Sequence, residues 1–233
     1  MSVEFERKFN IIGMLIGNGI LFILECITNY LMFAENKWAC FKYYTDISNA
    51  FALFVSGAMV VCCIFALLKN EPYLPKWIMA CKLISTTMLL ITFTIVVTFL
   101  APCFGVMGYL VFLFGGPMLF THTICPLYCI VSFVTIERGY RYKFRTTSYV
   151  ILPTLVYGII MIFLNIFGVV VGPYPFFMVY QFHWAIVTLW CAGVILWSYL
   201  MSIACWLFSG SKTKVLKRPV KNIAIEIEPL FTD

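Results

Sequence analysis

The sequence predicts an all-α, polytopic membrane protein: a bundle of six transmembrane helices with the N- and C-termini in the cytoplasm. The first observation is composition. The chain of 233 residues is 63% hydrophobic and only 11% charged, whereas a soluble domain carries about 25% charged residues. So few charges cannot cover a surface that faces water, and the bilayer is therefore the expected solvent of the bundle.

The second observation is a series of six apolar runs, each at least about 18 residues long, which is the length that a bilayer core requires. The runs cover residues 11–33, 50–68, 77–101, 106–136, 148–171 and 184–208. The first run is longer than the core of a signal peptide and lacks a small-residue cleavage signature, so we expect it to be retained. The fourth is too long for one crossing. Gly115-Gly116-Pro117 divides it into an interfacial or re-entrant piece and a spanning helix.

The third observation is the distribution of Lys and Arg, which are enriched in cytoplasmic loops. With the N-terminus inside, thirteen of the sixteen lie in inner segments and two, Lys37 and Lys42, lie in outer loops. The remaining one, Lys82, lies near the inner end of the third helix, where we expect it to extend to the interface. This asymmetry predicts cytoplasmic termini in a multi-pass protein of the cell membrane. A membrane domain, residues 1–210, precedes a basic tail, 211–233, expected to be flexible.

Charge and cysteines narrow the expected partners. The net charge of +6 is spread over short segments that flank the membrane, so membrane lipids are expected partners and nucleic acid is not. Eight of the ten cysteines lie within expected helices, where cysteine behaves as a small apolar residue. Cys40 and Cys103 both fall near the outer face, where they could pair. No metal or other cofactor is expected.

The stretch FKYYTDISNAF, residues 41–51, places a cluster of polar side chains at the mouth of the second helix. Thr45 and Asn49 are four residues apart and so share a helix face. Helix capping is the ordinary explanation, because Thr, Ser, Asp and Asn are favoured at helix N-termini. The alternative is that Thr45 is a nucleophile.

Polar groups within a bilayer are costly and are therefore candidates for function. At about 1.5 Å of rise per residue, Glu25, His122 and Asn165 reach similar depths in the outer half of the bundle. The same calculation places Thr45 and Asn49 above that layer. A threonine hydroxyl becomes a good nucleophile when a base takes its proton, and an imidazole, which titrates near neutral pH, suits that task.

These residue types allow one catalytic arrangement and several alternatives. Thr45 would attack, His122 would act as base, and Glu25 would orient the imidazole as in a triad. Asn49 or backbone N–H groups would hold an oxyanion, with Asn165 in a supporting position.

The alternatives use other residues. Cys125 could be the nucleophile beside His122, and His183 could be the base. His122, Cys125 and Cys129 share a helix face, but a metal site there needs a further ligand. His122 could also simply pack between helices.

Three short motifs carry a resemblance. They are K-Y-x-T-x-I, met by Lys42, Tyr43, Thr45 and Ile47; a His-Thr followed by Pro, met by His122, Thr123 and Pro126; and a P-Y-P segment within GPYPFF, residues 172–177. With them the chain resembles the family of the androgen-induced protein and the androgen-dependent protein that regulates tissue-factor-pathway inhibitor, together with its uncharacterised bacterial relatives.

This resemblance implies an activity. Animal members of the family hydrolyse fatty acid esters of hydroxy fatty acids with a threonine and a histidine inside the membrane. Carried over, Thr45 is the nucleophile, His122 is the base, and a lipid ester is the substrate. An acyltransferase of similar architecture, or a transporter or lipid-binding protein without catalysis, remains the alternative.

Overall fold

The structure, a computed structural model, describes residues 3–71, 74–137, 140–174 and 177–210. Within these ranges every regular element is a helix, and six helical stretches are long and apolar enough to cross a membrane. The prediction of an all-α, multi-pass membrane protein is confirmed at this level. The expected basic tail, residues 211–233, lies outside the described residues.

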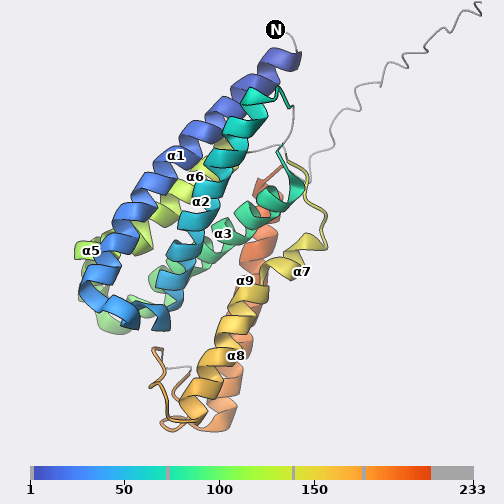
Figure 1. Ribbon diagram of the computed structural model, residues 1–233. Helices are drawn as coiled ribbons and strands as arrows, with labels where there is room; N and C mark the ends of the chain where they lie inside the picture. The colour runs from blue at the N-terminus through green and yellow to red at the C-terminus, as the bar shows by residue number, and fades with distance from the viewer. Residues whose placement is uncertain (1–2, 72–73, 138–139, 175–176, 211–233) are drawn as a thin grey trace, which may run out of the picture.

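The helices follow one another with short connections (Figure 1). In chain order they are α1 (Val3–Asn36), a 3₁₀ helix (Lys37–Lys42), α2 (Tyr44–Leu68), α3 (Lys76–Ile95), a π-helical turn (Val96–Leu100), a 3₁₀ turn (Pro102–Phe104), α4 (Gly105–Phe114), α5 (Gly116–Leu119), a second π-helical turn (Phe120–Ile124), α6 (Cys125–Thr135), α7 (Thr146–Val150), α8 (Leu152–Ile166) and α9 (Trp184–Phe208).

The packing of α1 against α2 and α6 forms one side of the bundle (Figure 1). Gly17 of α1 approaches α6 so closely that a Cβ there would lie 2.9 Å from Oγ of Ser132. The hydroxyl of Tyr128 on α6 donates to the Gly17 carbonyl at 3.2 Å. Small residues permit such close contact in membranes, where packing and hydrogen bonds hold helices together without help from the hydrophobic effect.

The fourth apolar run is divided where the sequence predicts. α4 ends at Phe114 and α5 begins at Gly116, whose φ of +47° lies in the left-handed region that glycine adopts without strain. With ten residues, α4 is about 15 Å long and cannot cross a bilayer core. It packs against both π-helical turns and against α5, so this short helix lies beside residues 120–124.

Two helix boundaries differ from the ends of the apolar runs. α2 begins at Tyr44, before its apolar run starts at residue 50, so Thr45 and Asn49 belong to its first turns, as the sequence predicts, and both are buried. α8 ends at Ile166 instead of residue 171. There the side chain of Asn165 donates to the Val170 carbonyl and accepts from the N–H of Val179, which fixes the chain in a turn.

α8 and α9 lie side by side and extend away from the group formed by α1, α2 and α6 (Figure 1). The remainder of α9 packs against α3 and α7. The space between these two groups is bounded by α3 and by the α4–α5 segment, and a cavity lies there.

The sequence predicts that Lys82 of α3 extends to the membrane interface, and the structure shows that it does not. It is 0% exposed. Its Nζ lies 2.8 Å from Oδ1 of Asn18 on α1 and 3.2 Å from Oε1 of Glu137, just after α6. Nδ2 of Asn18 also donates to that Glu137 oxygen at 2.9 Å. One buried ion pair and one amide therefore join α1, α3 and the end of α6.

We predict that removing one partner of this pair destabilises the protein, whereas removing both partners does so much less. Lys82→Met should lower the free energy of unfolding by about 3–5 kcal/mol, because it leaves an unpaired buried carboxylate. The double variant Lys82→Met, Glu137→Leu should recover most of that loss. Unfolding in mixed micelles measures both, and a double variant less stable than Lys82→Met would contradict the assignment.

Candidate functional site

A cavity of about 680 Å³ lies at the end of the bundle where α1 turns into α2. Its walls are mostly apolar side chains of α3, the first π-helical turn, α4, α8 and α9, such as Ile91, Ile95, Phe99, Phe112, Ile162 and Val194. Polar residues line it as well, among them Thr45, Asp46, Thr121, His122 and Tyr174. An apolar cavity with a few polar groups is the usual form of a small-molecule site.

The amide of Asn49 connects the two parts of the chain that carry Thr45 and His122. Nδ2 of Asn49 donates to the Thr45 carbonyl at 2.8 Å and to the Thr121 carbonyl at 3.3 Å. Because one amide nitrogen reaches both carbonyls, the first turn of α2 and the second π-helical turn lie side by side. The expected separation in depth between Thr45 and His122 is therefore wrong.

Thr45 does not cap α2. The N-cap is Tyr43, and no side chain makes a capping hydrogen bond there. Thr45 is the second residue of the helix and is 8% exposed. Capping thus leaves its hydroxyl unexplained, and that hydroxyl belongs to a residue of the cavity wall.

His122 lies in the second π-helical turn and is 7% exposed. Its Nδ1 lies 2.8 Å from the carbonyl oxygen of Phe112 on α4. A carbonyl oxygen only accepts hydrogen bonds, so Nδ1 must carry the hydrogen. In the neutral imidazole, Nε2 is then the unprotonated nitrogen, and none of the described residues forms a hydrogen bond with it.

Tyr174 is a further polar residue of the cavity that residue-by-residue reasoning from the sequence did not single out. A hydrogen bond joins its side chain to that of Thr45. Burial raises the pKa of Tyr174 to about 12, and the bond with Thr45 opposes this rise. At neutral pH the phenol is therefore protonated and able to donate. The signal that could have found it is the P-Y-P segment noted in the sequence, of which Tyr174 is the tyrosine.

Glu25 does not orient His122. It is fully buried, near Lys82 and Cys125, but it does not line the cavity, and neither carboxylate oxygen has a hydrogen-bond partner among the described residues. The backbone carbonyl of Phe112 takes the orienting position instead. Similar depth in two helices did not bring the two side chains together, because Glu25 lies near Cys125 of α6 and Lys82 of α3, whereas the imidazole of His122 is bonded to Phe112 of α4.

The two supporting asparagines have different positions from those expected. The Nδ2 group of Asn49 is already bonded to two carbonyls, and Asn49 is not among the residues that line the cavity. It is not placed to hold an oxyanion, and it positions its neighbours instead. Asn165 fixes the turn after α8 through the backbone of Val170 and Val179 and likewise does not line the cavity.

The alternative residues are accounted for in other ways. The imidazole of His183 caps α9 by accepting from the N–H of Ala185, and it is exposed. Sγ of Cys125 lies 3.1 Å from Oγ1 of Thr28. Cys40 and Cys103 are both free thiols, so the disulfide considered from the sequence is not formed. Within the described ranges, no three His, Cys, Asp or Glu side chains are grouped as metal ligands would be.

No family model, curated protein or solved structure matches the chain. The assignment of a function therefore depends on the cavity and on the residues that line it.

We predict that Asn49→Ala destabilises the protein by roughly 1–3 kcal/mol, the cost of leaving buried polar groups without a partner. Glu25→Gln is the matched control, because it changes a buried polar residue whose carboxylate oxygens have no hydrogen-bond partner to lose. Unfolding in mixed micelles compares the two. Equal stability of the two variants would show that Asn49 does not hold α2 against the π-helical turn.

Proposed function

We propose that the protein is an intramembrane hydrolase that cleaves lipid esters, such as fatty acid esters of hydroxy fatty acids, in the cavity of about 680 Å³. The observation that carries this proposal is the placement of Thr45 and His122 on the wall of one apolar cavity. Its volume lies within the range of about 300–1,000 Å³ that is usual for ligand sites. The resemblance of residues 42–49 to the family described above supports the same roles.

The tautomer of His122 suits it to act as a base. With Nδ1–H donated to the Phe112 carbonyl, Nε2 can accept the proton of the Thr45 hydroxyl as its oxygen attacks the ester carbonyl. The new C–O bond gives a tetrahedral intermediate. Its collapse expels the alkoxide, which takes the proton from Nε2 and leaves as the alcohol, with the acyl group on Thr45. Water, activated by the same nitrogen, then releases the fatty acid and restores the hydroxyl.

Thr45 and His122 are not hydrogen-bonded to each other among the contacts of the described residues. Such bonds often tighten only when substrate binds. The carbonyl of Phe112 fixes the imidazole in one direction, and the hydrogen bond between the side chains of Thr45 and Tyr174 fixes the Thr45 hydroxyl. These two contacts restrict the orientations of the imidazole and of the hydroxyl before the substrate binds.

The start of α2 offers donors for the oxyanion. The first N–H groups of a helix have no acceptor within the helix, and Thr45 is the second residue of α2. Those N–H groups carry the positive end of the helix dipole. The side chain of Tyr174 is hydrogen-bonded to the backbone of Tyr44 and Thr45 at this end of α2. In this proposal the substrate displaces that contact, and the N–H groups then take the role that the sequence suggested for backbone amides.

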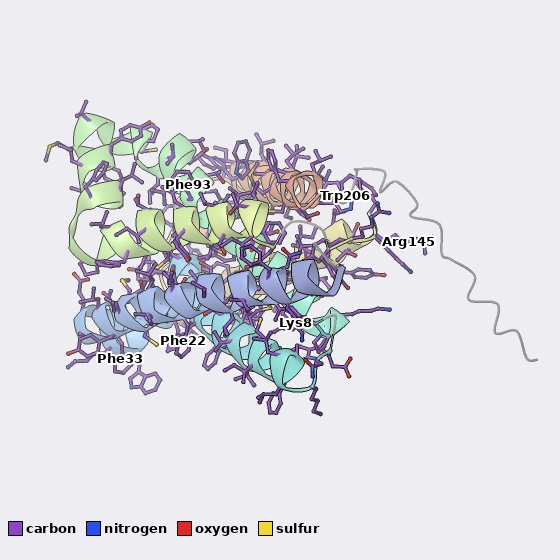
Figure 2. All side chains as sticks on the ribbon, turned by 90° about the horizontal axis from the view of Figure 1, so that it is seen from above. Lys8, Phe22, Phe33, Phe93, Arg145 and Trp206 are labelled. Carbon is purple, nitrogen blue, oxygen red and sulfur yellow. The ribbon has the colours of Figure 1, made fainter. Side chains whose placement is uncertain are left out.

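We also propose that the cavity lies in the outer half of the cell membrane. Figure 2 shows Lys8 and Arg145 at one end of the molecule and Phe33 toward the other. By the enrichment of Lys and Arg in cytoplasmic loops, the end with Lys8 is cytoplasmic, and lipid enters from the outer leaflet.

A pair of cysteine substitutions tests this orientation. In intact cells, a membrane-impermeant maleimide should label Lys37→Cys, whereas Lys143→Cys should react only after permeabilisation. Labelling is read as a mass shift relative to the parent protein, which corrects for native cysteines. The reverse pattern would place the cavity in the inner leaflet.

The Thr45–His122 pair should behave as one unit. Thr45→Ala and His122→Ala should each lower kcat/KM for a fatty acid ester of a hydroxy fatty acid by about 10²–10⁴-fold. The double variant should be little worse than either, because groups that act in one step are non-additive. Thr45→Ser should keep part of the activity, since its hydroxyl remains but rotates more freely.

Glu25→Gln serves as the matched control in this assay and should stay within about twofold of the wild type, because Glu25 does not line the cavity. If the losses from Thr45→Ala and His122→Ala multiply in the double variant, the two residues do not act in one step. If Thr45→Ala hydrolyses the ester as fast as the wild type, Thr45 is not the nucleophile.

A further inference from the structure

Asp46, the residue after Thr45, is a buried carboxyl group without a partner. It is 4% exposed and lines the same cavity. Neither Oδ1 nor Oδ2 has a hydrogen-bond partner in the described part of the chain. Its position in the first turn of α2 is favourable to an acidic residue. However, an acid that acts as a cap accepts a backbone N–H, and Asp46 accepts none.

The charges around Asp46 do not compensate it. Glu35, near the end of α1, also lines the cavity and lies close enough to act on Asp46 as a like charge. No Lys or Arg is among the described residues that line the cavity. The cavity therefore contains two carboxyl groups and no permanent positive charge.

Burying a charge without a partner costs several kcal/mol, so such groups in membranes mark sites where a partner binds. We propose that Asp46 binds a protonated amine of the substrate, so that among lipid esters those that bear an amine bind more tightly than those that do not. This inference rests on the proposed hydrolase function only for the ester; the amine site itself stands on Asp46. The amine-bearing end of the lipid lies at Asp46, and the acyl chain occupies the apolar part of the cavity.

The chemistry of the site favours a primary ammonium over other cations. An ammonium group carries three N–H donors, and two unpaired oxygens of Asp46 accept from them. Tyr43, Tyr44 and Tyr174 line the same cavity, and aromatic rings attract a cation. A quaternary ammonium has no N–H to donate. A calcium ion requires six to eight oxygen ligands, more than these carboxyl groups supply.

Equilibrium binding of dodecylamine and of dodecanol to the purified full chain in micelles tests the proposal at pH 7. The wild type should bind the amine at least about tenfold more tightly than the alcohol, the usual weight of one charge-assisted hydrogen bond. Asp46→Asn should remove that preference and leave dodecanol binding within about twofold. Glu71→Gln, which removes an equal charge from an exposed position, should behave as the wild type.

A comparison that needs no variant keeps the test decisive if Asp46→Asn does not fold. In the wild type, dodecyltrimethylammonium should bind at least about tenfold more weakly than dodecylamine. Equal binding of the amine and the alcohol, or equal amine binding in the wild type and in Asp46→Asn, would overturn the proposal. Tighter binding of dodecyltrimethylammonium than of dodecylamine would also overturn the proposal, and it would assign the binding of the cation to the tyrosine rings.

The failure of this inference is distinguishable from the failure of the hydrolase. Thr45→Ala should lose ester hydrolysis but keep the preference for dodecylamine. Asp46-dependent amine binding in a wild type that hydrolyses no ester would contradict the hydrolase and retain the amine site. Hydrolysis of amine-bearing and neutral esters at equal rates would contradict the amine site alone.

Discussion

Inside a bilayer there is no water to satisfy a polar group, so polar groups in the bundle depend on partners within the protein. This constraint explains the contacts that position the helices. Lys82, Glu137 and Asn18 bond to one another and thereby join α1, α3 and the end of α6. The position of these helices then determines where α2 can pack, and so where the cavity lies.

The same constraint makes the exceptions informative. Asn49 donates through Nδ2 to two backbone carbonyls and so holds α2 against the second π-helical turn, although its Oδ1 has no partner among the described residues. The two carboxylate oxygens of Asp46 have no hydrogen-bond partner in the described part of the chain, although the residue is buried. A polar group that is satisfied serves the fold, whereas one that is left unsatisfied on a cavity wall is free to meet a ligand. Glu25 is unsatisfied too, but it is enclosed among α1, Cys125 and Lys82 and has no cavity to face.

The helices were predictable from sequence because an apolar run of sufficient length has few alternatives in a membrane. The division before Pro117 was predictable because glycine and proline interrupt helices. The site was harder. Depth calculated along straight helices placed Glu25 beside His122 and Thr45 well above it, but the return of α4 and the π-helical turns change both the height and the direction of His122.

Contacts between distant parts of the chain were also beyond sequence reasoning. The bond between Tyr174 and Thr45 joins a loop to the start of α2 across more than half of the chain. The sequence pattern of neither segment indicates that the two are in contact. Asp46 stood in the polar stretch at residues 41–51, but only burial without a hydrogen-bond partner distinguishes it from an ordinary acidic residue in a first turn.

The central claim is that the hydroxyl of Thr45 becomes acylated during turnover. Rapid acid quenching of the wild-type protein with a lipid ester, followed by tryptic digestion and mass spectrometry, tests it directly, because cleavage after Lys42 and Lys69 isolates residues 43–69 as one peptide. The account predicts that this peptide gains the mass of the acyl group, that fragmentation assigns it to Thr45, and that the gain is absent from Thr45→Ala. Turnover with the acyl group on Cys125, or with no acylated peptide at any time, would contradict it.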